Sequence, residues 1–181
     1  TKRCFYEKKL IFIVFVTIIS LSILGCGNNS QKKGRNKTCS NRKKVEAICP
    51  TAGIGDNISL FNANYGEPKG DQPKIYSNGK MLVFDADNLA TNITIYDEQG
   101  RVFNLEQMAD FIPTDTKIIE QYEDTTADFP TQIIICESQK LSQSLPIAAK
   151  DGKFTITQRV NLPERGGDGK TVIIIGLGDK P

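Results

Sequence analysis

The sequence contains no histidine and no tryptophan among its 181 residues. Histidine is the side chain that most often acts as a general base near neutral pH and that most often binds zinc. Catalytic sites of the Ser-His-Asp and Cys-His kinds are therefore excluded. The sequence predicts no cofactor and no metal site, and any hydrolytic chemistry would have to depend on carboxylates.

Charge of either sign is unevenly distributed, although the whole chain has a formal net charge of only +2. Residues 53–181 carry twelve basic and nineteen acidic residues, a net charge of −7. Residues 26–52 contain a single acid, Glu46, and seven basic residues: Lys32, Lys33, Arg35, Lys37, Arg42, Lys43 and Lys44. The acidic part lacks the positive face that phosphate binding requires, so we expect no nucleic-acid partner.

The N-terminal segment has the three parts of a bacterial export signal. Four basic residues come first, namely Lys2, Arg3, Lys8 and Lys9. An apolar stretch of 15 residues follows at 10–24, and the chain then reads Ile23-Leu24-Gly25-Cys26. This last motif resembles the lipobox of bacterial lipoproteins, in which an aliphatic residue, a variable residue and a small residue precede the lipidated cysteine.

The lipoprotein resemblance implies cleavage before Cys26 and diacylglycerol on its thiol. It predicts a signal peptide at 1–25 and a protein held outside the cytoplasm, on a bacterial membrane, by its lipid. An uncleaved membrane anchor is the alternative. A membrane-spanning helix needs about 20 apolar residues, and the 15-residue stretch favours the signal peptide.

The segment 26–52 is predicted to be a largely disordered, basic tether, because 27–44 contains almost nothing apolar. It would act as a spacer, and its basic residues would also be attracted to anionic lipid. Cys39 and Cys49 are close in the sequence, and disulfides persist in exported proteins. A disulfide between the two and a pair of free thiols are therefore both open alternatives. Cys136 follows three isoleucines and is predicted to be a core residue.

The remainder, 53–181, is predicted to be an acidic globular α+β domain. Asp56 or Asn57 caps a first helix, and Asn78-Gly79 is a strong signal for a hairpin turn. Helices are expected at 56–68, 104–112 and 138–145, and strands at 74–76, 80–84, 92–96, 117–122, 132–136, 153–160 and 171–176. Short connections favour a mostly antiparallel sheet with short helices packed on one face. Two helix-plus-hairpin halves, 54–98 and 104–178, would be consistent with a diverged duplication.

The segment 54–98 resembles a known group of lipoprotein domains. Its predicted helix closes in Tyr65-Gly66-x-Pro68 and is followed by a hairpin. This order is similar to that of the SmpA/OmlA-type outer-membrane assembly lipoproteins and of domains with the β-lactamase-inhibitor-like fold. The resemblance covers about a quarter of the chain and implies a lipid-anchored accessory domain that presents a sheet face to a partner.

Two sequence motifs suggest ligand sites, but neither has all the residues that such a site requires. The glycine-rich run 165–171 has Glu164 where a Walker A loop needs its first glycine, so we expect a flexible hairpin loop. The acidic run 84–88 lacks the glycine of a calcium loop and is predicted to be a turn. A catalytic site made of two carboxylates that the fold brings together stays an open alternative. Its candidates are Asp85, Asp87, Asp97 and Asp115.

The favoured hypothesis is a non-enzymatic accessory or binding module of the cell envelope. Tyr76, Tyr96 and Tyr122 would contact an envelope protein partner if they are exposed on the sheet, because tyrosine is enriched at interfaces. Their alternative interpretation is as half-buried strand residues. A carboxylate-dependent extracytoplasmic hydrolase is the second hypothesis, and a structural spacer without a ligand is the third.

Overall fold

The computed structural model describes residues 46–180. The predicted signal peptide, the lipidation site Cys26, the tether up to residue 45 and Cys39 lie outside the described residues. The described residues belong to one compact unit.

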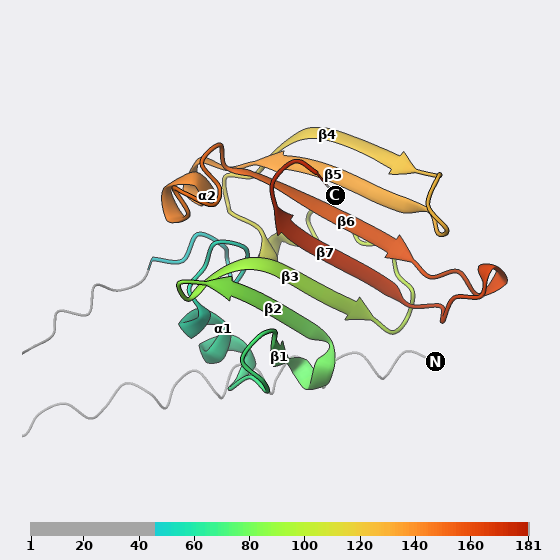
Figure 1. The fold of residues 1–181 in the computed structure, drawn as a ribbon, viewed down its shortest axis with the longest axis horizontal. Coiled ribbons are helices and arrows are strands. Elements are labelled where there is room, and N and C mark those ends of the chain that lie inside the picture. Colours follow the sequence, from blue (N-terminus) through green and yellow to red (C-terminus); the bar gives the residue numbers. More distant parts are fainter. Residues whose placement is uncertain (1–45, 181) are drawn as a thin grey trace, which may run out of the picture. The chain divides into compact units, whose positions relative to one another are not determined.

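The described residues form a single seven-stranded sheet in which every neighbouring pair is antiparallel (Figure 1). The predicted antiparallel sheet is therefore confirmed. The strand order is β1-β2-β3-β7-β6-β5-β4. The strands are β1 (Lys74–Tyr76), β2 (Met81–Ala86), β3 (Leu89–Asp97), β4 (Lys117–Asp124), β5 (Thr131–Glu137), β6 (Lys153–Val160) and β7 (Thr171–Leu177).

Helices are few and short among the described residues. The two α-helices and three 3-10 helices are α1 (Ile58–Tyr65), α2 (Gln139–Ser144), η1 (Ser77–Gly79), η2 (Ala109–Phe111) and η3 (Pro163–Arg165). Asn57 caps α1 by accepting the backbone N–H of Ser59 at 2.9 Å. None of the helices in 46–180 is long and apolar enough to cross a membrane.

The helix predicted at 104–112 is wrong. Its capping box does form, because Asn104 and Gln107 exchange hydrogen bonds of 2.9 and 3.0 Å between side chain and backbone. Only the 3-10 turn η2 follows. The carbonyl of Phe111 instead accepts the backbone N–H of Ile54 at 3.0 Å. Within the segment the hydrogen bonds join residues three apart, such as that from the Phe111 N–H to the Met108 carbonyl at 3.0 Å, so tight turns form in place of an α-helix.

The two predicted halves do not share one order of elements. The first runs α1, β1, β2, β3, whereas in the second α2 lies between β5 and β6. The halves meet where β3 pairs with β7, with Ile93 opposite Ile175 and Ile95 opposite Ile173. The sheet therefore consists of two meanders joined by a pair of strands that are distant in the sequence.

Asp56 fastens the start of the folded unit to the core. Its buried carboxylate accepts the backbone N–H groups of Ile48 at 2.8 Å, Cys49 at 3.3 Å and Gly53 at 2.9 Å. The carbonyl of Ile48 also accepts the N–H of Thr114 at 3.0 Å. Residues 48–52, expected to belong to a largely disordered tether, are therefore part of the fold.

Candidate functional site

The sheet has two faces of different character. Strand residues alternate between faces, and Val83, Ile93 and Ile173 on one face belong to the buried core. The opposite face, which we name the outer face, carries one row of registered residues across six strands: Leu82, Thr94, Ile174, Thr157, Ile133 and Tyr122. None of these six side chains is charged.

The outer face is more apolar than a solvent-facing sheet surface. An antiparallel sheet with one wet face shows alternating polar and apolar residues, whereas continuous apolar runs are typical of strands covered on both faces. Residues 133–136 in β5 and 172–175 in β7 are such runs. Ile174 is nevertheless 38% exposed and Phe84, on the same face, 39% exposed. The outer face therefore offers apolar surface that the described residues leave uncovered.

The three predicted tyrosines lie in three different environments. Tyr76 is 2% exposed, and its hydroxyl donates to Asn62 Oδ1 at 2.7 Å. The expectation that Tyr76 is exposed is therefore wrong, because it pairs with Met81 on the core side of the sheet. Tyr96 is half-buried, between two core-facing positions of β3. Tyr122 is 39% exposed at the β4 edge.

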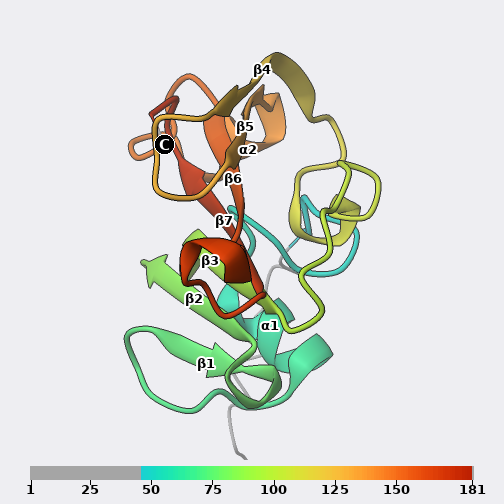
Figure 2. The ribbon, with the colours of Figure 1, turned by 90° about the vertical axis from the view of Figure 1, so that its right-hand side faces the viewer.

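Strand β4 is an exposed edge with both apolar and acidic side chains. Its first seven residues are exposed, including Ile118 and Ile119 at 49% each. Glu120, Glu123 and Asp124 are its acids, against a single basic residue, Lys117. Figure 2 shows β4 at one end of the sheet and β1 at the other.

The other edge strand, β1, is short and occupied. It has three residues, and Lys69 exchanges two backbone hydrogen bonds with Ile75 at 2.8 and 2.9 Å. In the part of the chain that the structure describes, the backbone of β4 pairs only with β5. The sheet is thus closed at one edge and open at the other.

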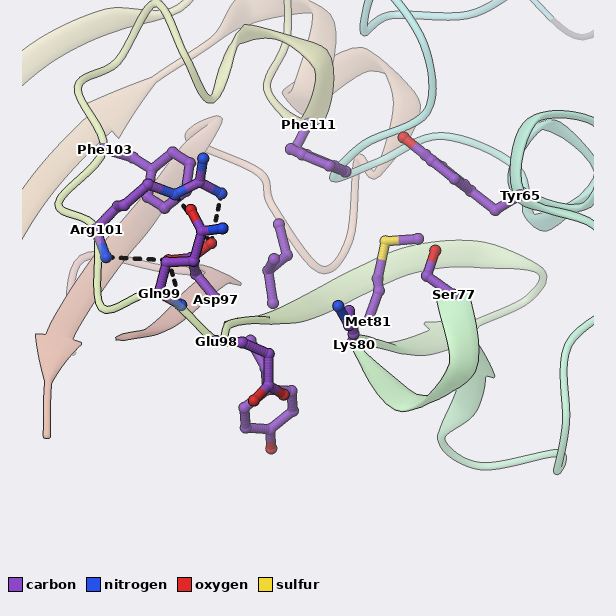
Figure 3. A pocket seen from close by; sticks show the side chains of 12 residues that line it. Tyr65, Ser77, Lys80, Met81, Asp97, Glu98, Gln99, Arg101, Phe103 and Phe111 are labelled. Atoms are coloured by element: carbon purple, nitrogen blue, oxygen red, sulfur yellow. Dashed lines mark hydrogen bonds and ion pairs between the residues drawn. The ribbon is translucent and has the colours of Figure 1, made fainter. Parts of the chain in front are cut away.

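A pocket of about 370 Å³ lies on the core side, near the end of β3 (Figure 3). Its charged end is formed by Asp97 and Arg101, and Arg101 also lies over the Phe103 ring, 5.1 Å from the centroid. Hydrogen bonds from Arg101 lower the pKa of Asp97 below its usual value. This acid is therefore ionised and engaged, which is the opposite of what a general acid requires.

The remainder of this pocket is lined by both apolar and polar side chains. Met81 and Ile95 belong to the sheet side, and Tyr65 and Phe111 stack at 6.4 Å between ring centroids. Figure 3 places Tyr65 at the end opposite Arg101. Such a pocket combines apolar surface for a small group with polar side chains, because it is also lined by Ser77, Lys80, Glu98 and Gln99.

The other candidate carboxylates serve structural contacts. Asp85 accepts a hydrogen bond of 2.6 Å from Lys74, and Asp87 occupies the β2–β3 turn with a φ of 51°. Burial alone would raise the pKa of Asp115, but hydrogen bonds that include one from Ser138 lower it overall. Ser138 is also the N-cap of α2. The structure does not bring these acids together with Asp97 in one pocket.

The two cysteines among residues 46–180 are buried. The thiol of Cys49 donates to the Ile54 carbonyl at 3.6 Å, and burial raises its pKa. Cys136 lies in the core, as predicted, and burial raises its pKa to about 11. Cys49 forms no disulfide within the described residues, and a bridge to Cys39 stays a prediction.

Neither a metal centre nor a similar protein assigns a function to the described residues. Within 46–180, no three side chains of His, Cys, Asp or Glu are grouped so that they could hold a metal ion. No protein-family model matches the chain, and no curated protein or solved structure matches it either. The resemblance of 54–98 to the SmpA/OmlA-type lipoproteins stays a prediction.

Sequence reasoning selected Tyr122 but missed three other exposed apolar residues of the strands, namely Phe84, Ile119 and Ile174. A signal for them was present, because an unbroken apolar run such as 172–175 leaves no polar face for solvent. The exposed position of Ile119 had no such signal. It follows from the place of β4 at the edge of the sheet, where Ile118 is equally exposed.

Proposed function

We propose that this protein is a lipid-anchored, non-enzymatic binding module of the bacterial envelope that contacts a protein partner through the outer face. The observation that carries the proposal is apolar surface on the second face of the sheet. Ile174 and Tyr122 are its exposed members in one registered row. Apolar side chains that water contacts favour association, because burial of their surface releases about 25 cal/mol per Å².

The partner is proposed to be a protein with apolar side chains surrounded by basic ones. Residues 46–180 carry twelve basic and twenty acidic residues, a net charge of −8. At the β4 end of the outer face, Glu120 and Asp124 lie beside Tyr122. Acids at the rim of an apolar patch accelerate and orient the approach of a basic partner more than they strengthen the complex.

The proposed location follows from the predicted lipid on Cys26, which would hold the protein outside the cytoplasm on the membrane. The predicted tether, ending before residue 48, would allow the folded unit to reach a partner in the envelope. The proposal keeps the predicted arrangement in which helices lie on one face of the sheet. The partner would then cover the other face.

Site-specific photo-crosslinking in bacterial cells tests the proposal with the full-length chain. A benzoylphenylalanine at position 174 or 122 reports on the outer face, and one at the exposed position Glu106 is the matched control. We expect a discrete adduct with one protein from the two outer-face positions. The substitution Ile174→Asp should remove the adduct formed from position 122, because a charge in a dry interface is costly.

The adduct also identifies the class of partner. A mass equal to two copies of this chain would replace the proposed heterologous partner by self-association. No adduct from positions 174 and 122, or equal adducts from the Glu106 position, would overturn the proposal. Either result would favour the spacer hypothesis, in which the domain binds nothing.

A further inference from the structure

We propose that the open edge of β4 binds an extended segment of a partner protein as an additional strand, and that this segment has basic residues two positions either side of an apolar one. The inference rests on the proposed function in that the partner is a protein. It adds the mode of binding and the chemistry of the recognised segment. Three observations support it: the free edge, a regular stretch of backbone, and a symmetric pattern of side chains.

The free edge provides the binding groups. In residues 46–180 no backbone hydrogen bond joins β4 to anything other than β5. Each unpaired strand edge presents a row of N–H and C=O groups that another chain can pair with. The β1 edge does not compete, because Lys69 already pairs with Ile75 there. Strand addition is therefore directed to one end of the sheet.

The regular stretch sets the length of the recognised segment. Glu120 to Asp124 pair with Ile135 to Thr131 without interruption, whereas a bulge lies between Ile118 and Glu120. Bulges bend a strand and disturb pairing. A partner strand would thus pair with a five-residue edge, about 17 Å long at 3.4 Å per residue.

The side chains on this stretch are arranged symmetrically. Glu120, Tyr122 and Asp124 share the outer face with Ile133 and Ile135, by their register with β5. Residues directly opposite across an antiparallel pair have Cβ atoms about 5 Å apart. An added strand would therefore place one basic residue opposite each acid and an apolar residue opposite Tyr122. Because acid, aromatic and acid read the same in both directions, the pattern itself imposes no strand direction.

Charge argues against a second copy of this chain as the added strand. Two β4 strands would bring together six acids, Glu120, Glu123 and Asp124 from each copy, and only two lysines. Like charges opposite each other destabilise a strand pair. The sole role of charged residues on an edge strand can also be to prevent pairing with another chain. Exposed Ile118, Ile119 and Tyr122 are the opposite of what such protection requires.

Fluorescence anisotropy on the full-length chain in detergent micelles tests the inference with a defined probe. The probe is a labelled nine-residue peptide of threonines with a central lysine–threonine–valine–threonine–lysine segment. One matched peptide has glutamates in place of the lysines. Another keeps the lysines but is N-methylated at the valine and the following residue, so that one lost N–H always faces β4.

Two double variants of the protein separate local from general attraction. E120K/D124K reverses the proposed contacts, and D71K/E106K makes the same change of net charge at two exposed acids elsewhere. We expect E120K/D124K to weaken binding of the lysine peptide at least about tenfold and to bind the glutamate peptide instead. D71K/E106K should change affinity by no more than about twofold.

Hydrogen exchange supplies a second readout, because the β4 amides that point away from β5 should be protected only when the lysine peptide is bound. Equal binding of the N-methylated peptide, equal weakening by both double variants, or no binding of any peptide would overturn the inference. Crosslinking from position 174 that persists in E120K/D124K would, in that case, leave the proposed outer-face function standing without strand addition.

Discussion

The carboxylate of Asp56 accepts the backbone N–H of Ile48 across 2.8 Å, and the same carboxylate holds Cys49 and Gly53. A buried acid thus replaces regular secondary structure as the organiser of the first described residues. Unfolding this segment would leave a buried carboxylate without its donors. The segment before α1 is therefore expected to unfold together with the sheet.

We expect Asp56→Ala to lower the free energy of unfolding by about 2–4 kcal/mol, because three backbone donors lose a charged acceptor. Urea denaturation of the full-length chain measures the change. Asp71→Ala, at an exposed acid, is the control and should stay within about 0.5 kcal/mol. A loss of stability at Asp56 as small as that of the control would contradict the proposed anchoring role.

Asp97 gives a prediction on pH dependence. Its pKa is lowered, first by the hydrogen bond from Arg101, so its ionised form favours the folded state. This stabilisation is complete above the unfolded pKa of about 3.9 and is lost as the pH falls through the lower folded pKa. Asp97→Asn should therefore be less stable than the natural chain at pH 7, by about 1 kcal/mol because Arg101 is exposed to solvent.

The difference between the two proteins should shrink as the pH falls below about 4. Thermal unfolding at a series of pH values between 3 and 7 measures it. Glu106→Gln provides a control at an exposed acid. A stability difference that is the same at every pH would show that Asp97 acts through its shape and not through its charge.

Burial of Cys49 and Cys136 predicts that neither reacts with iodoacetamide in the folded protein. In denaturant without reductant, both should be alkylated, as peptide mass spectrometry would show. Cys136 is the internal control, because no disulfide is predicted for it. If Cys49 reacts only after reduction, then it is paired, and Cys39 is the expected partner.

Lipidation is tested by metabolic labelling with an alkyne fatty acid. The natural chain should incorporate the label, and Cys26→Ser should abolish incorporation, because the thiol is the predicted acceptor. Cys39→Ser is the matched control and should keep the label. Label retained in Cys26→Ser would refute the lipoprotein assignment.

The strands and α1 could be predicted because their signals are local. Asn57 supplies a cap, and runs of β-branched residues alternate with turns at positions such as Asp87 and Asn88, which both have positive φ. The segment 104–112 was mispredicted because a genuine capping box stood before it. The hydrogen bonds that follow join residues three apart, as between Phe111 and Met108, and a capping box does not distinguish such turns from an α-helix.

The candidate site was harder to predict than the fold. Tyr76 and Tyr122 both lie in edge strands that the sequence predicted, yet Tyr76 is buried in the core and Tyr122 is 39% exposed. The face on which a strand residue lies depends on register, and the bulge after Ile118 shifts that register in β4. Edge position depends on strand order, which no local pattern encodes.

The order of the strands also constrains how the chain acquires its structure. Strand β7 is the last of the seven in the sequence but the central one in the sheet, with β3 on one side and β6 on the other. The two meanders, β1 to β3 and β4 to β6, therefore each keep one inner edge unpaired until β7, residues 171–177, has been synthesised. Pairing between distant segments slows folding, so we expect the pairing of β3 with β7 to be a late step in the folding of this chain.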